Sequence, residues 1–271
     1  MIVDAAGVAR SVSVIIPAKN EQQRIAATVE AALRLPHVDV VIVCDDGSTD
    51  ETARYAGAVG SVVVNHDRNR GKAAALDSAV NALGVREQRD HRPECDTLLF
   101  LDADLEASAA NAAPLIAPVL AGSAELTIGV LPAQQTPDGS PAGGFGLVMT
   151  TARRGIEELT GWSARAPLSG QRCLTRRAFE VASPLATGFG VEVGMTVDIL
   201  KAGLRVVEID VELHHRATGT DLAGQLHRAK QLRDVTRALT GRGLVQSSLT
   251  DLKGSSAVTS VVGSLRDRFR R

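Results

Sequence analysis

Short apolar runs alternate with helical patterns along the first 130 residues of the chain. The apolar runs predict strands at 12–16, 38–44, 61–65, 97–101 and 126–130. The periodicity between them predicts helices over 22–35, 49–58, 72–83 and 109–121. Strands that alternate with helices favour a mainly parallel sheet with flanking helices, which is an α/β, Rossmann-like fold.

The second half of the chain begins with a change in composition. Residues 131–146 are rich in Pro, Gly, Gln, Ser and Asp, and a loop of this length is usually functional or disordered. The segments beyond it predict helices near 150–159, 191–201 and 222–240 and extended chain at 168–175 and 206–213. We expect 1–130 and 131–245 to be two halves of one domain, and the Ser- and Gly-rich residues 246–271 to form a flexible tail.

Composition and charge limit the classes of function. A net charge of −1 gives no reason to expect a nucleic-acid partner, and no apolar run reaches the length of a membrane-spanning helix. The N-terminus has no signal-peptide pattern, and the three cysteines form no Cys-x-x-Cys pair. We therefore expect a cytoplasmic protein with reduced thiols; the basic end of the tail allows a weak peripheral contact with a membrane.

Two carboxylates follow the apolar run at 97–101. Asp102 and Asp104 are two positions apart, and in extended chain such residues point to the same side. Open α/β sheets bind their ligands outside the carboxyl ends of the strands, and paired carboxylates suit Mg²⁺ or Mn²⁺. The sequence thus predicts a metal site here, with a solvated turn as the simpler alternative.

Three other polar motifs follow predicted strands, at 17–21, 44–50 and 69–73. The first has neither the glycine pattern of a dinucleotide fold nor that of a P-loop. The second offers carboxylates that can accept a nucleobase N–H, and the third places Lys72 at a helix start, where backbone N–H groups attract phosphate. A helix cap explains Asn20 but not the whole first motif, and a tight turn leaves the two acidic residues of the second without a role. Four such motifs in order at one sheet edge predict a nucleoside diphosphate held through a metal.

These motifs, from 12 to 50, at Arg70-Gly71-Lys72 and at 101–104, resemble those of family-2 glycosyltransferases of the GT-A fold. The resemblance implies a nucleotide-sugar donor, a UDP- or GDP-sugar, with Asp46 on the base and Asp104 on the metal. It places Asp102 near the ribose or the metal and Lys72 near the diphosphate. It also implies a nucleotide pocket lined by Pro17, Ala18 and Glu21.

Three later segments, 167–171, 188–194 and 214–216, resemble the bacterial glucosyl-3-phosphoglycerate synthases, a GT-A group that retains anomeric configuration. This resemblance implies that His215 completes the metal site and that Glu192 lies beside the acceptor or the anomeric carbon. It implies a sugar and acceptor region formed by Ser169, Gly170, Gln171 and Arg172. The Arg that binds the acceptor in those synthases is missing at 146–150, where Arg153 or Arg154 could replace it.

The expected activity is metal-dependent transfer of a sugar, glucose or mannose, with Glu192 and Asp104 as catalytic residues. The acceptor is open between a small phosphorylated acid and a polyprenyl phosphate, because polyprenyl-phosphate sugar synthases carry a related Gly-aromatic-Gly-x-Glu segment. A sugar-phosphate nucleotidyltransferase would need a Gly-rich loop after the first strand, and a non-catalytic nucleotide-sugar binding module would not need Glu192. We expect residues 137–146 to close over the donor, and a homodimer is a candidate assembly.

Overall fold

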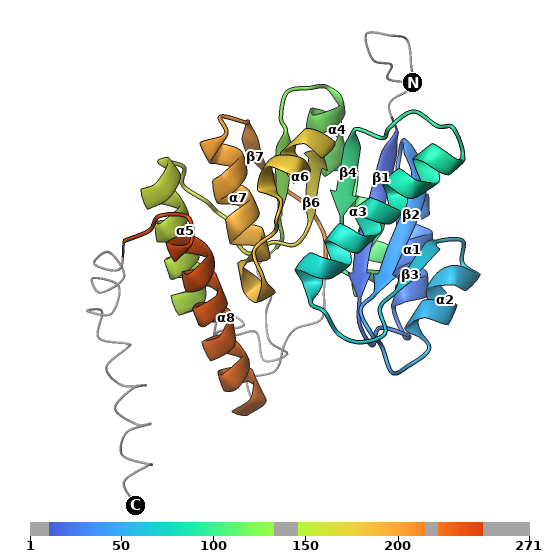
Figure 1. Ribbon diagram of the computed structural model, residues 1–271, viewed down its shortest axis with the longest axis horizontal. Helices are drawn as coiled ribbons and strands as arrows, with labels where there is room; N and C mark the ends of the chain where they lie inside the picture. Colours follow the sequence, from blue (N-terminus) through green and yellow to red (C-terminus); the bar gives the residue numbers. More distant parts are fainter. Residues whose placement is uncertain (1–10, 133–145, 215–221, 246–271) are drawn as a thin grey trace, which may run out of the picture.

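The computed structural model describes residues 11–132, 146–214 and 222–245, and it contains a seven-stranded sheet (Figure 1). The strand order is β3-β2-β1-β4-β6-β5-β7. The strands are β1 (Val12–Ala18), β2 (Val38–Asp45), β3 (Val62–Asn65), β4 (Thr97–Phe100), β5 (Leu126–Val130), β6 (Arg172–Thr175) and β7 (Val206–Asp210).

The sheet is mainly parallel, as predicted, and β6 is the exception. Strand β6 runs antiparallel to both of its neighbours, β4 and β5. Its first residue, Arg172, pairs with Phe100, the last residue of β4. The segment that leads into β6 therefore meets the segment that leaves β4, and this brings residues 167–171 to the edge where the first four strands end.

Helices cover both faces of the sheet. Val14 packs with α1 and α4, whereas its neighbour Ile15 packs with α3, since successive strand residues point to opposite faces. A third cluster joins α5, α7 and α8. The helices are α1 (Ile25–Leu33), α2 (Thr52–Ala58), α3 (Lys72–Arg89), η1 (Glu106–Ala112), α4 (Ala113–Leu120), α5 (Gly146–Thr160), α6 (Arg176–Ala182), η2 (Gly188–Gly190), α7 (Val191–Lys201) and α8 (Leu222–Thr240).

Several predicted bounds are wrong, for local reasons. Strand β1 continues through Pro17, which we expected to end it; β4 pairs with β1 only as far as Ile15, so Pro17 interrupts no ladder on that side. Helix α1 starts at Ile25 and not at 22, because the residues before it form a turn bonded to the next loop. Helix α6 was not predicted; Thr175 caps it by accepting a hydrogen bond from the Ala178 N–H.

Some predictions lie outside the described residues: the closing loop at 137–145, the metal ligand His215 and the tail at 246–271. None of the helices in the described ranges is long and apolar enough to span a membrane.

Candidate active site

The four predicted motifs converge at one edge of the sheet. Strands β2 and β4 both run parallel to β1, and β3 runs parallel to β2, so the loops after all four leave the sheet at the same edge. The prediction that the motifs share one edge is confirmed. Hydrogen bonds and ion pairs between the loops fix the positions of their side chains in the site.

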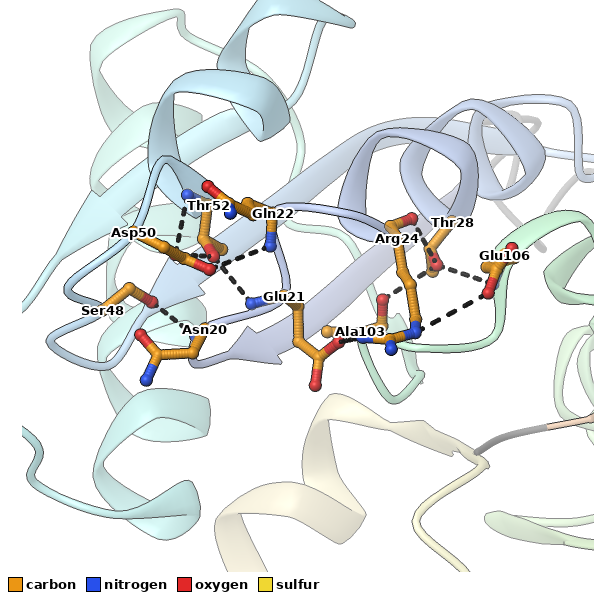
Figure 2. A network of polar contacts seen from close by, with 10 residues as sticks. All are labelled: Asn20, Glu21, Gln22, Arg24, Thr28, Ser48, Asp50, Thr52, Ala103 and Glu106. Carbon is orange, nitrogen blue, oxygen red and sulfur yellow. Dashed lines mark hydrogen bonds and ion pairs between the residues drawn. The ribbon is translucent and has the colours of Figure 1, made fainter. Parts of the chain in front are cut away.

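The first loop is bonded to the second through backbone N–H groups (Figure 2). The N–H of Asn20 donates to Ser48 Oγ at 2.8 Å, and that of Glu21 donates to Thr52 Oγ1 at 2.8 Å. Just before this turn, Pro17 is half-buried, and the carbonyl of the buried Ala18 accepts the Asp46 N–H at 2.8 Å. The two loops therefore form one rigid wall of the site.

The first loop is also bonded to the turn that carries Asp104. Figure 2 shows Thr28 Oγ1 between two backbone groups of that turn: it donates to the Ala103 carbonyl at 2.9 Å and accepts the Glu106 N–H at 2.8 Å. The Arg24 guanidinium donates to Glu21 at 2.7 Å and lies 3.8 Å from the Glu106 carboxylate. These contacts fix the Asp102–Asp104 turn relative to the first loop.

Asp46 holds the third loop in place. The residue is 6% exposed, and its carboxylate accepts the backbone N–H groups of Arg70 at 2.7 Å and Gly71 at 2.8 Å. Burial alone would raise the pKa of Asp46, but these bonds and one from His66 lower it below its ordinary value. Gly47 allows the close approach, since a Cβ there would lie 2.5 Å from the Arg68 carbonyl carbon.

Lys72 lies between two carboxylates from distant parts of the chain. Its Nζ is 2.8 Å from Asp102 Oδ1 and 2.9 Å from Glu192 Oε1. Burial would lower the pKa of Lys72, but the two carboxylates outweigh it and raise that pKa above its ordinary value. The three charged groups therefore form one ionised cluster at the end of β4.

The segment before β6 completes this cluster. Gln171 Nε2 donates to Asp102 Oδ2 at 2.6 Å, and Gln171 Oε1 accepts the Asp102 N–H at 3.0 Å. Gly170 packs so closely that a Cβ on it would lie 2.6 Å from Lys72 Nζ. The neighbouring hydroxyl of Ser169 accepts the Gln171 N–H at 3.4 Å. Three of the four predicted sugar and acceptor residues thus lie at the cluster.

Arg172, the fourth, lies beneath the site. It is 1% exposed and donates to the Ser169 carbonyl at 2.8 Å and to Thr196 Oγ1 at 2.9 Å. Burial lowers the pKa of Arg172 to about 10. Since the guanidinium is enclosed, its contacts support the loop at 167–169 and do not reach into the site.

Asp104 lines a different part of the site from Asp102. The expectation that both carboxylates point to one spot assumed extended chain, but β4 ends at Phe100 and residues 103–104 form a turn. Residues 212–214 dock nearby, because the His214 N–H donates to Ser108 Oγ and Asn111 donates to the Glu212 carbonyl. The resulting cavity of about 420 Å³ is lined by Arg24, Asp104, Leu105, Glu106, Ala107, Ser108 and His214.

This cavity suits a divalent cation. Carboxylate oxygen together with imidazole nitrogen is a donor set that Mn²⁺ accepts, and Mg²⁺ takes the oxygens. Among the described residues no three His, Cys, Asp or Glu side chains converge into a complete ligand group. The expected additional ligand, His215, directly follows His214 in the sequence and lies outside the described residues.

One residue with a direct link to the site was missed in the sequence. His66 follows β3, is buried, and its Nδ1 lies 2.7 Å from Asp46 Oδ1. Its Nε2 lies 2.9 Å from Ser78 Oγ. A single histidine in a polar loop forms no pattern in the sequence, so only the fold reveals these contacts.

Comparisons with known proteins show the family to which the chain belongs. Residues 13–143 match the model of glycosyl transferase family 2. The chain is 30% identical over 241 residues to the glucosyl-3-phosphoglycerate synthase of Mycolicibacterium smegmatis, covering 81% of this chain and 75% of that protein. It is 29% identical over 252 residues to the enzyme of that name from Mycobacterium tuberculosis, covering 83% and 72%.

Solved structures give the same result. The M. tuberculosis glucosyl-3-phosphoglycerate synthase with Mn²⁺, UDP and phosphoglyceric acid matches with a TM-score of 0.67 and 25% identity, covering 87% of this chain and 80% of that one. Its complex with Mn²⁺, UDP-glucose and phosphoglyceric acid has a TM-score of 0.65 and 26% identity, covering 86% and 79%. The chain belongs to glycosyl transferase family 2 and is a glycosyltransferase of the GT-A fold.

Proposed function

We propose that the protein transfers glucose from UDP-glucose to a small phosphorylated carboxylic acid such as 3-phosphoglycerate, with Mg²⁺ or Mn²⁺ bound. The observation that carries this proposal is the Asp102–Lys72–Glu192 cluster beside the Asp104 cavity. The names and bound molecules of the similar synthases support the donor, the cation and the acceptor. In this proposal residues 1–130 supply the donor half of the site and 131–245 the acceptor half.

The donor nucleotide would lie against the first two loops. Pro17, Ala18 and Glu21 would line its pocket. The Asp46 carboxylate accepts three hydrogen bonds from the protein, which leaves one of about four lone-pair positions for a base N–H. Lys72, at the first position of α3, would neutralise charge on the diphosphate.

Asp104 and His215 would hold the cation, at the cavity that His214 also lines. When bound, the cation supplies Lewis-acid stabilisation of the negative charge on the leaving diphosphate. Arg24 and Ser108 line the same cavity and would limit its size and its access to water.

Glu192 would act at the sugar. It is 8% exposed, and its carboxylate faces Lys72 at the position where the donor diphosphate and the sugar would meet. A carboxylate there can stabilise positive charge at the anomeric carbon or accept the proton of the acceptor hydroxyl. Asp102 and Gln171 would orient Lys72 for the same step.

The acceptor would lie against Ser169, Gly170 and Gln171, with Arg172 supporting that segment from below. Its phosphate needs a cation. Arg153 and Arg154 are both exposed, and Arg153 gives one of its five N–H donors to the Arg165 carbonyl, so both arginines are candidates.

A transfer assay with the full chain tests the proposal. UDP-, GDP- and ADP-glucose would each be offered with Mn²⁺, Mg²⁺ or EDTA, and with 3-phosphoglycerate, glycerol 3-phosphate or a polyprenyl phosphate as acceptor. We expect transfer from UDP-glucose to 3-phosphoglycerate that EDTA abolishes, and an NMR spectrum of the product that shows retained anomeric configuration. Transfer to the polyprenyl phosphate alone would contradict the proposed acceptor, and absence of all donor turnover would contradict the proposal as a whole.

A further inference from the structure

The contacts of His66 connect three parts of the donor side of the site. The residue lies between the end of β3 and the start of α3, and 4% of its side chain is exposed. One ring nitrogen lies 2.7 Å from Asp46 Oδ1, and the other lies 2.9 Å from the hydroxyl of Ser78 in α3. The ring is therefore fixed at both ends, and its Nδ1 points at the carboxylate that holds the third loop.

Asp46 in turn sets the path of the backbone into α3. Its two oxygens accept the successive N–H groups of Arg70 and Gly71, which are the last two residues before the helix. Gly71 has φ of +92°, which glycine adopts without strain but does not enforce, so the Asp46 carboxylate helps to select this conformation of the turn. The next residue is Lys72, which joins Asp102 and Glu192.

We propose that His66 is a positioning residue for donor binding: by donating to Asp46 it fixes the Arg70–Gly71 turn and so places Lys72 at the diphosphate. The donor half of this statement rests on the proposed function. The link from His66 to the turn rests on the contacts of this chain alone.

The chemistry favours a specific role over general packing. Asp46 Oδ1 accepts two hydrogen bonds, one from His66 and one from the Arg70 N–H. If the bond from His66 is lost, the bond to this oxygen that remains comes from the turn itself, and the turn then has a less firmly placed acceptor. A buried carboxylate that loses a donor is stabilised less, and its position is less well fixed. The ring also contacts the Ser78 hydroxyl and the Cys44 thiol, which accompany its bond to Asp46.

A matched set of variants tests the role. In His66→Asn the amide nitrogen can take the place of Nδ1, two bonds from Cβ, and donate to Asp46. In His66→Gln the amide lies one bond further out, near Ser78, and the donor to Asp46 is lost. His66→Ala loses both contacts. UDP affinity would be measured for each full-length variant by calorimetry, with thermal unfolding as the measure of folding.

We expect His66→Gln and His66→Ala to weaken UDP binding about tenfold or more, a loss of about 1.4 kcal/mol, and His66→Asn to stay within about threefold of the wild type. A packing role would instead order the variants by lost volume and would not favour Asn over the larger Gln. Equal UDP affinity in the Asn and Gln variants, or unchanged affinity in His66→Gln, would overturn the proposal.

Amide hydrogen exchange tests the role of His66 independently of the proposed function, because it needs no bound nucleotide. Exchange at the Arg70 and Gly71 amides should be faster in His66→Gln than in His66→Asn, without nucleotide, while the interior of α3 is unchanged. If the wild type binds no UDP, the proposed donor is wrong, yet this measurement still tests the link from His66 to the turn. Equal exchange rates at the Arg70 and Gly71 amides in His66→Gln and His66→Asn would overturn that link. This comparison does not need His66→Ala, so it still applies if that variant does not fold.

Discussion

The Lys72 ammonium lies 2.9 Å from Glu192 Oε1, although the two residues come from different halves of the chain. Lys72 begins α3, and Glu192 lies in the first turn of α7. In the proposed function this ion pair joins the donor side of the site to the acceptor side. The proposed sugar transfer takes place between those two sides, so the ion pair lies where the reaction would occur.

The first prediction concerns Lys72. Lys72→Met should lower kcat for transfer at least about 100-fold, because a charged group that stabilises developing negative charge contributes that much in comparable sites. It also leaves Asp102 and Glu192 without their shared cation. Lys72→Arg is the matched control, and it should keep more of the activity because it keeps the charge. Equal rates for the Met and Arg variants would show that the charge of Lys72 plays no part.

The second prediction concerns Gly170. A Cβ at this position would lie 2.6 Å from Lys72 Nζ and 2.8 Å from Asp102 Oδ1, so Gly170→Ala should displace the ion pair and lower kcat. Gly84→Ala is the matched control. Gly84 lies inside α3 with no atom near its would-be Cβ, so the same change should stabilise the protein by about 0.4–1 kcal/mol and leave kcat unchanged. Assays and thermal unfolding of both variants check this, and an active Gly170→Ala would contradict it.

The third prediction concerns pH. The pKa of Asp46 lies below its ordinary value of 3.8 in the folded protein, so its ionised carboxylate stabilises the fold above that ordinary value. This stabilisation is lost as pH falls through the lowered folded pKa. Asp46→Asn cannot titrate, and it should lower the free energy of unfolding by about 1–3 kcal/mol at pH 5, because it disturbs a buried acceptor.

The measurement is the difference between the two proteins. Urea unfolding of the wild type and of Asp46→Asn should give a larger difference in the free energy of unfolding at pH 5 than at pH 3. A difference that grows as the pH falls would have the wrong sign for a carboxylate with a lowered pKa.

The sequence predicted that the loops converge because buried strands are recognisable as short runs of apolar residues. Four runs of apolar residues, each followed by polar motifs, sufficed to place those motifs at one sheet edge. Helices α7 and α8 have the predicted bounds, and Gly203 and Gly241 follow closely after their last residues.

The features that the sequence did not predict are the direction of one strand and the contacts of individual side chains. The four residues of β6 do not reveal in the sequence that this strand is antiparallel, and that reversal brings Gln171 to Asp102. The resemblance to the synthases implied that Gln171 and Arg172 both lie in the ligand region. Successive residues of extended chain point to opposite sides, and only Gln171 faces the site. His66 had no pattern at all.

The fourth prediction concerns the cation. Asp104→Asn should lower Mn²⁺-dependent turnover at least about 100-fold and weaken Mn²⁺ binding measured in the presence of UDP, because a carboxylate ligand is worth several kcal/mol to the bound metal and its chemistry. Asp67→Asn is the matched control, since Asp67 is an exposed carboxylate in a nearby loop and should leave both quantities unchanged. Full Mn²⁺ affinity in Asp104→Asn would contradict the assignment of this cavity.

The two adjacent histidines then decide how the metal site is completed. The family resemblance assigns His215 as a ligand, and of the residues that the structure describes His214 lines the cavity with Asp104. Successive residues of extended chain point to opposite sides, so only one of the two can share a metal with Asp104. We expect His215→Ala to weaken Mn²⁺ binding at least about tenfold, comparable with the loss of a group that supports a metal site, and His214→Ala to change it little. Mn²⁺ affinity would be measured for both variants by calorimetry or by the Mn²⁺ EPR signal. Weaker binding in His214→Ala than in His215→Ala would identify His214, and not His215, as the ligand.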